Sequence, residues 1–109
     1  METTPNNFLG LDPQYCAYET ARFAVLPVPY DLTACYQAGS RNGPAAIIAA
    51  SKQLEEFDEE VQAECYECGI ATLDPVEPNV SGPEQMHEEL FRHARRIVTD
   101  GKFLISLGG

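Results

Sequence analysis

The sequence predicts an α/β fold in which helices cover a parallel sheet. Apolar runs at Arg22–Leu26, Gly69–Asp74 and Lys102–Leu107 alternate with two helical segments, one from Pro44 and one after Ser81. Parallel strands need a long crossover, usually a helix, so this strand–helix alternation is typical of a parallel sheet.

The first residues lack a regular hydrophobic period. Residues 1–20 contain scattered Asn, Gly and Pro, and we expect an irregular arm there, with the α/β domain spanning residues 21–109. The run Arg22–Leu26 is followed by Pro27 and Pro29. It therefore predicts a buried strand that the prolines stop and that opens into a loop.

A helix is expected from Pro44 to Ser51, because proline suits the first helical position. This segment is apolar all round, so we expect it to be buried on most sides. The following stretch, Leu54–Glu60, is strongly acidic, and we expect it to be solvated. The run Gly69–Asp74 predicts a second strand, which Pro75 ends.

The second helix has the clearest amphipathic pattern. Ser81 and Glu84 match a capping box, and Asp100 with Gly101 marks the end of the helix. Apolar residues fall on one arc: Met86, Leu90, Ala94, Ile97 and Val98. Charged residues fall opposite: Glu88, Glu89, Arg92, Arg95 and Arg96. Glu88 and Arg92 are spaced for an i,i+4 ion pair.

Charge narrows the possible partners. The chain has 17 acidic and 7 basic residues and a net charge of −10, which argues against nucleic acid, since phosphate binding needs clustered Lys and Arg. An acidic surface could steer a cationic guanidine or polyamine, or it could be an ordinary solvated face. The sequence shows no secretory signal and no run of membrane-spanning length, so we expect a cytoplasmic protein with reduced thiols.

Two side-chain pairs are weak candidates for sites. Cys65 and Cys68 have a redox or zinc spacing, but they precede a strand and have no second ligand pair, so we expect incidental cysteines. His87 and His93 are six residues apart on one helix, which turns them about 120° from each other. They therefore cannot chelate one ion together, and we expect packed or edge histidines.

The loop after the first strand is the stronger candidate. It leaves the carboxyl end of a strand, where α/β sheets place ligands. We expect the following loop residues to face a substrate cleft or a subunit interface: Asp31, Thr33, Gly39, Arg41 and Gly43. The structural alternative is that the glycines serve turns and the arginine pairs with a local acid.

A pair of glycines, Gly108-Gly109, ends the third strand, and such a pair lets the backbone approach a neighbour or a bound ion. The sequence offers no complete catalytic set, because it has neither a nucleophile–base pair nor a carboxylate cluster on one face. We therefore expect no catalytic residue and no metal ligand in this chain.

Several phrases in order resemble agmatinase-type ureohydrolases of the arginase superfamily. They are Val25–Asp31, Gly39–Pro44 with Ala46-Ile47 and Ala50-Ser51, Leu54–Asp58, Gly82–Met86 and Gly101–Gly109. Two positions depart from the family pattern: Ile48 stands where a basic residue is frequent, and Leu32 where a small residue is common.

The resemblance implies a three-layer α/β/α fold and hydrolysis of a guanidino compound, with agmatine giving putrescine and urea. It also implies two manganese ions holding a hydroxide, a homo-oligomer when complete, and no membrane partner. In the family, the phrase ending Leu-Gly-Gly precedes the first metal ligand. We therefore expect an N-terminal portion truncated before the ligands, inactive and without bound metal by itself.

Two other readings remain open from the sequence. The chain could be a short, non-catalytic interaction subunit derived from the same family. It could also be a small redox or zinc module built on Cys65 and Cys68.

Overall fold

The computed structural model describes residues 1–30, 39–54, 57–58, 63–79 and 81–108. Its helices and 3-10 turns are η1 (Phe8–Gly10), α1 (Pro13–Cys16), η2 (Ser40–Asn42), α2 (Gly43–Ser51), η3 (Cys65–Cys68) and α3 (Pro83–Thr99). Its strands are β1 (Phe23–Val28), β2 (Phe57–Asp58), β3 (Ala63–Glu64), β4 (Ile70–Thr72) and β5 (Phe103–Gly108).

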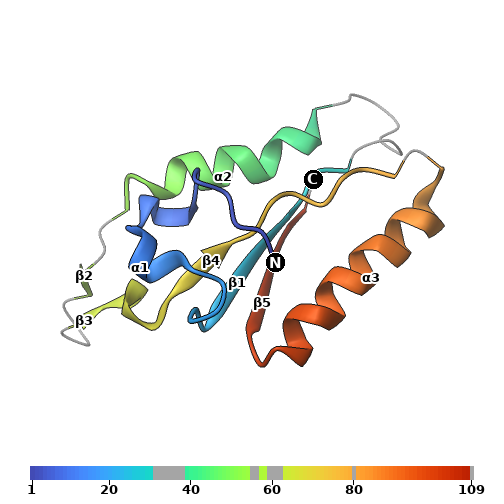
Figure 1. Ribbon diagram of the computed structural model, residues 1–109. Coiled ribbons are helices and arrows are strands. Elements are labelled where there is room, and N and C mark those ends of the chain that lie inside the picture. Colours follow the sequence, from blue (N-terminus) through green and yellow to red (C-terminus); the bar gives the residue numbers. More distant parts are fainter. Residues whose placement is uncertain (31–38, 55–56, 59–62, 80, 109) are drawn as a thin grey trace.

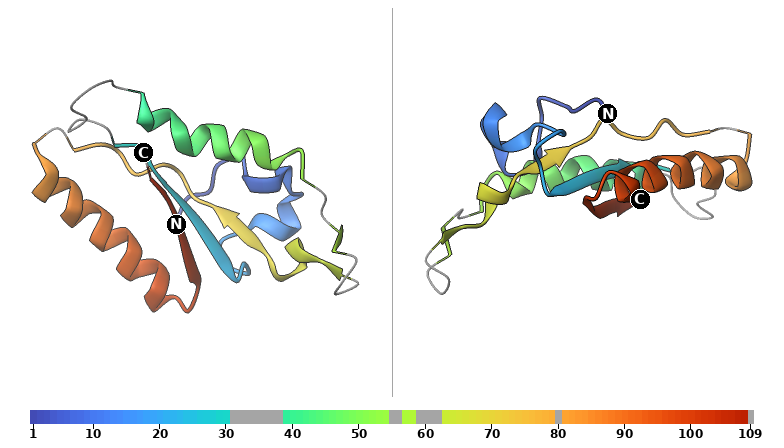
Figure 2. Two further views of the ribbon diagram at one scale, coloured as in Figure 1. Left: turned by 180° about the vertical axis from the view of Figure 1, so that it is seen from behind. Right: turned by 60° about the horizontal axis from the view of Figure 1, so that its bottom comes forward.

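The main sheet has the order β4-β1-β5, and both of its strand pairs are parallel. The chain moves from β1 to β4 through α2 and then crosses back to β5 through α3. Right-handed crossovers in opposite directions place the two helices on opposite faces of the sheet, as Figures 1 and 2 show. The predicted three-layer α/β/α architecture with a parallel sheet is thus confirmed.

The principal core lies between the sheet and α3. Alternate residues of a strand face the same side, and the even-numbered residues of β1 face this helix. Met86 and Ile97 of α3 pack there with the strands. The other buried members of the cluster are Tyr18, Ala21, Ala24, Leu26, Val28, Ala71, Leu73 and Val76.

On the opposite face, α2 is less buried than its composition predicts. Only Pro44, Ile48 and Ser51 of this helix are buried, and Ile47 keeps 45% of its surface exposed. The expectation that α2 is buried on most sides is therefore wrong for this chain. Only one face of the helix meets β1, β5 and η1, and its remaining apolar face meets solvent.

Proline does not stop the first strand where the sequence suggested. β1 continues through Pro27 to Val28. The carbonyl oxygens of Val25 and Pro27 both accept hydrogen bonds on the β4 side, from Leu73 and Val76. The N–H group that Pro27 lacks would point to that side, beyond the last β1–β4 pair, so no ladder bond is lost.

The N-terminal arm contains two helical turns, η1 and α1, and it closes one edge of the sheet. Thr3 forms an antiparallel bridge with Leu73, just after β4. The arm also meets the α2 face, where the amide of Leu9 donates to Ser51 Oγ at 2.8 Å. The boundary at residue 20 between arm and domain stays a prediction.

Helix α3 begins one residue later than a capping box requires. Its N-cap is Gly82, with φ of 136° and no side-chain cap hydrogen bond, so the capping role predicted for Ser81 and Glu84 is wrong. Pro83 explains the shift, because proline favours the first helical position and would be the second residue of a helix capped by Ser81. The predicted helix end is confirmed, with Asp100 as C-cap.

The surface of α3 also differs from the expected arcs. Arg92 forms its ion pair with Glu89 at i,i+3, rather than with Glu88. Val98, which was expected in the buried arc, is 61% exposed. Ile97 already occupies the core side of the last turn, and the adjacent position on a helix points about 100° away.

The acidic stretch 54–60 lies mostly outside the described residues, although Leu54 is exposed.

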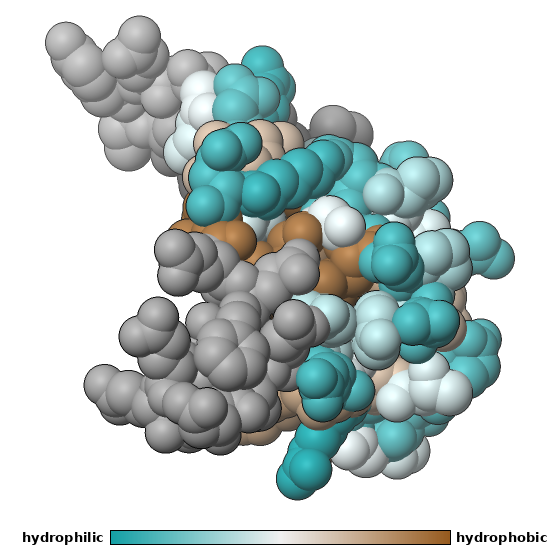
Figure 3. All heavy atoms as spheres, turned by 90° about the vertical axis from the view of Figure 1, so that its left-hand side faces the viewer, coloured by the Kyte–Doolittle hydropathy of each residue, from teal (hydrophilic) through white to brown (hydrophobic). Residues whose placement is uncertain are grey.

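Seen from the side of α1 and β2–β3, the molecule shows apolar surface bordered by polar side chains (Figure 3). None of the helices in the described ranges is both long and apolar enough to cross a membrane.

Candidate functional site at the carboxyl edge of the sheet

The three parallel strands end at one edge, where the start of α2 meets the end of β5. Because β1, β4 and β5 run the same way, the residues after them gather at this edge. A Cβ atom built on Gly43 would lie 3.6 Å from the carbonyl oxygen of Gly108. The structure thus brings together two of the residues that the sequence singled out, one from the loop and one from the strand end.

Arg41 lies at the same edge, beside a small hollow. The hollow has a volume of about 190 Å³, and four prolines, Pro27, Pro29, Pro44 and Pro75, contribute to its wall. Arg41 is the charged residue among those that line it. The prolines are stiff, since each ring fixes its backbone φ angle, so Arg41 lies beside a preformed surface.

Gly39 has a conformational role. It precedes η2 with φ of 145°, in a region that favours glycine. Gly43, by contrast, has a helical φ of −59°, so its conformation does not require glycine. The turn role considered for both glycines therefore fits the conformation of Gly39, whereas Gly43 donates its N–H to the carbonyl oxygen of Ser40 at the end of η2 without needing a glycine conformation. Three other predicted site residues, Asp31, Thr33 and Gly109, lie outside the described residues.

Titratable side chains do not converge into a metal centre in the described ranges. Among those residues, no group of three or more His, Cys, Asp or Glu could hold a metal ion. His87 is exposed, and His93 Nδ1 lies 2.8 Å from the carbonyl oxygen of Glu89. The described part of this edge contributes backbone, prolines, Arg41 and Asp74, which follows β4.

The cysteine pair sits in η3, directly before β4, as the sequence predicted. Cys68 is exposed. The side chain of Cys65 lies outside the described residues, so incidental cysteines stay a prediction and the redox or zinc module stays the alternative to it.

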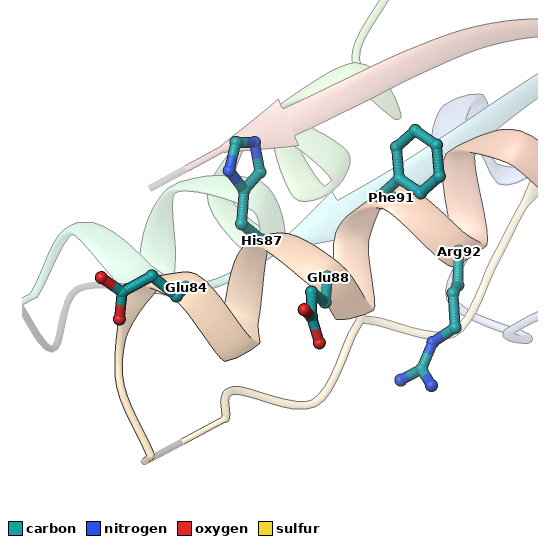
Figure 4. A pocket seen from close by; sticks show the side chains of 5 residues that line it. All are labelled: Glu84, His87, Glu88, Phe91 and Arg92. Atoms are coloured by element: carbon teal, nitrogen blue, oxygen red, sulfur yellow. The ribbon is translucent and has the colours of Figure 1, made fainter.

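A second hollow runs along α3, where the sequence indicated no site. It has a volume of about 480 Å³ and is lined by Glu84, His87, Glu88, Phe91 and Arg92. His87 and Phe91 project to one side of the helix, and Glu88 and Arg92 project to the other (Figure 4). The sequence signal was Phe91 itself, a large apolar residue that belongs to neither arc of the helix.

The resolved pKa shifts lie at the other end of β5. Tyr18 Oη donates to Asp100 Oδ2 at 2.5 Å, and Lys102 Nζ stands 4.5 Å from the centre of the Tyr18 ring. Burial, helped by this hydrogen bond, raises the pKa of Tyr18 to about 12. The same hydrogen bond lowers the pKa of Asp100. This cluster precedes β5 and fastens the arm to α3, away from the carboxyl edge.

Comparisons with known proteins agree with the fold. Residues 21–109 match the model of the Arginase family. The chain is 45% identical over 93 residues to an N(1)-aminopropylagmatine ureohydrolase of Thermus thermophilus, which covers 84% of this chain and 31% of that protein. It is 32% identical over 111 residues to an agmatinase of Klebsiella pneumoniae, covering 94% of this chain and 35% of that protein.

Among solved structures, the agmatine ureohydrolase of Thermoplasma volcanium superposes with a TM-score of 0.76 at 29% identity. The match covers 85% of this chain and 31% of that one. The chain thus spans about a third of the length of the relatives that it matches.

Proposed function

The chain belongs to the arginase family, and from this premise we propose that it serves a ureohydrolase as the first β-α-β-α-β unit of the catalytic domain. The proposal rests on one contact: at the carboxyl edge of the parallel sheet, the start of α2 at Gly43 lies against the end of β5 at Gly108. Ligands of such sheets bind at this edge. The role of the unit is to hold the end of β5 in place.

The reaction would be hydrolysis of a guanidino group. An oxygen of water bonds to the guanidino carbon, the bond from that carbon to the alkyl-bearing nitrogen breaks, and the released amine takes up a proton. Urea and an amine result. A guanidinium is resonance-stabilised and a poor electrophile, so the attacking water needs activation.

The sequence resemblance implies that two manganese ions activate the water. Among the residues that the structure describes, no group of side chains could hold such an ion. We therefore assign these residues to positioning only. Any ligands would have to come from other residues of the complete enzyme.

Two related substrates are candidates. Agmatine, which the sequence resemblance implies, is supported by relatives 32% identical to the chain that are named agmatinases. N(1)-aminopropylagmatine is supported by more similar relatives, with 45% identity, that are named for it. Both compounds are cationic, and the net charge of −10 would attract either. The alternative is a non-catalytic interaction subunit. It predicts that neither the chain alone nor an enzyme that contains it releases urea.

A fusion enzyme provides the test. This chain would replace the segment that it matches in the Thermus thermophilus relative, and urea release would be measured with each substrate, with and without added Mn²⁺. We expect manganese-dependent urea release from the fusion and none above the blank from the chain alone. A folded fusion without activity on either substrate would overturn the proposal.

A further inference from the structure

The buried polar side chains of the described residues all hydrogen-bond to the N-terminal arm. They are Asn7, Ser51 and Thr72. Asn7 belongs to the arm and pairs with the backbone of Leu11, whose N–H it accepts at 2.6 Å. Ser51 and Thr72 come from α2 and β4, and both accept an arm N–H. Because polar groups are rarely buried without a partner, these side chains are specific to a docked arm.

Ser51 is the last residue of α2 and joins this helix to the arm. Its Oγ donates to the carbonyl oxygen of Ile48 at 2.6 Å and accepts the N–H of Leu9 at 2.8 Å. The bond to Ile48 uses the single hydroxyl proton, so an oxygen lone pair is free to face the arm. Without this oxygen, the N–H of Leu9 would lose a buried partner.

The preceding arm residue is fastened to the sheet. Thr72 ends β4, and its Oγ1 accepts the N–H of Phe8 at 2.8 Å. Two successive arm amides thus connect the end of α2 with the end of β4, and η1 lies against both elements (Figure 1). We call these two hydrogen bonds the arm latch. Leu9 has φ of 69°, a conformation that a leucine keeps only where its surroundings impose it.

The helix α2 has few other attachments. Its buried residues are Pro44, Ile48 and Ser51, and its remaining face meets solvent. It is a rigid element about 12 Å long from Gly43 to Ser51. A shift at the Ser51 end would therefore reach the other end, where Gly43 lies against Gly108.

We propose that Ser51 and Thr72 are positioning residues for the carboxyl edge of the sheet. Through the arm latch they fix the C-terminal end of α2, and α2 in turn holds the end of β5 in place. The inference rests on the proposed function only for its effect on urea release. Its effect on α2 and β5 can be measured in the chain itself.

Hydrogen exchange followed by mass spectrometry measures that effect in the full chain. Ser51→Ala and the nearly isosteric Thr72→Val each remove one acceptor of the arm latch. Both should speed amide exchange about tenfold or more in α2 and at residues 106–108 of β5, and less than twofold in α3. Thr72→Ser keeps the acceptor oxygen and should exchange slowly, like the parent. Ser81→Ala, at an exposed serine, is the matched control.

A double-mutant cycle in the fusion enzyme tests whether the arm latch acts through α2. Ser51→Ala should lower kcat/KM at least threefold, and Gly43→Phe should lower it by crowding the end of β5. If both act on the same contact, the double variant should lie within twofold of Gly43→Phe alone.

Four results would overturn the inference. They are unchanged exchange in α2 of Ser51→Ala and Thr72→Val, equal exchange of Thr72→Ser and Thr72→Val, an equal rise in α3, and losses of kcat/KM that multiply in the double variant. An equal rise in α3 would mean that the substitutions lower general stability. Fast exchange in α2 and β5 with an inactive parent fusion would instead refute the proposed function and leave the arm latch standing.

Discussion

The carbonyl oxygen of Gly108 lies 3.6 Å from the point where a Cβ atom on Gly43 would stand. Gly43 begins α2 and Gly108 ends β5, so this contact connects the loop after β1 to the last strand of the unit. A single methyl group fits at that distance, which is ordinary van der Waals contact, and we expect a much larger side chain to crowd the end of β5.

Substitutions at Gly43 should therefore separate by size. Gly43→Ala should leave the stability of the fusion enzyme within about 0.5 kcal/mol and its kcat/KM unchanged, since φ is already helical. Gly43→Phe should push the end of β5 aside and lower kcat/KM roughly tenfold or more, because small misplacements at a reacting site are costly. Steady-state urea release checks both, and equal activity of the two variants would contradict the contact's role.

A pair of glycines tests the close packing at the amino ends of β1 and β4. Gly69 and Gly101 both have positive φ, at 89° and 79°, but a Cβ on Gly69 would lie 2.8 Å from Ala21 Cα, whereas one on Gly101 meets nothing within 4 Å. Gly101→Ala should cost about 1–2 kcal/mol for its backbone alone. Gly69→Ala should cost about 1–3 kcal/mol more for the overlap. Urea denaturation followed by circular dichroism measures both losses, and similar values would show that the backbone relaxes freely.

Two adjacent residues of α3 test which face of this helix packs into the core. Ile97 is fully buried in the principal cluster, and Val98 is 61% exposed. Ile97→Ala should lower the free energy of unfolding by about 2–5 kcal/mol, while Val98→Ala should change it by no more than about 0.5 kcal/mol. Denaturant midpoints of the isolated variants provide the comparison. A loss at Val98 as large as that at Ile97 would place the buried face one position away.

The fold could be predicted because its signals are local and periodic. The run at residues 22–26, the amphipathic pattern of α3 and the glycine after Asp100 each specify an element regardless of the rest of the chain. What could not be predicted depends on register. Pro27 is tolerated in β1 because β4 ends before the position of its missing N–H, and Thr3 meets Leu73 across about 70 residues of sequence.

The candidate site was predicted only in part for a similar reason. Strand-end position identified Gly43 and Gly108 separately, but their contact needs the crossover geometry of α2. The prolines that line the hollow beside Arg41 come from three separate segments, so no local sequence pattern predicts it. Burial of α2 was overestimated because composition reports how apolar a helix is, but not how many of its faces have a neighbour.

Arg41 should affect assembly more than catalysis. The positive charge of Arg41 would repel a cationic substrate. The position of Arg41 beside the proline-lined hollow therefore favours a contact between subunits over a contact with the substrate. Arg41→Ala in the fusion enzyme should shift the mass measured by light scattering toward smaller species and change kcat/KM less than threefold. The control is Arg95→Ala on the exposed side of α3. An unchanged mass would rule out the interface role.

The link between Tyr18 and Asp100 should make stability depend on pH at both extremes. The folded-state pKa of Asp100 lies below its ordinary value, so its contribution is present above about pH 4 and is lost as the pH falls through the folded pKa. The folded-state pKa of Tyr18 is raised to about 12 from 10.0. Its contribution is therefore complete below about pH 10 and is lost as the pH rises toward the folded value.

Tyr18→Phe removes the donor and should flatten both limbs of this profile, while it lowers the thermal midpoint between them. Tyr15→Phe is the matched control, because Tyr15 contacts Tyr66 through its ring, with centroids 4.7 Å apart, and phenylalanine keeps that ring. Thermal midpoints measured from pH 3 to pH 11 would show the effect. If the Tyr18→Phe profile kept both limbs of the parent, other groups would control the pH dependence and the hydrogen bond to Asp100 would contribute little to holding the arm on α3.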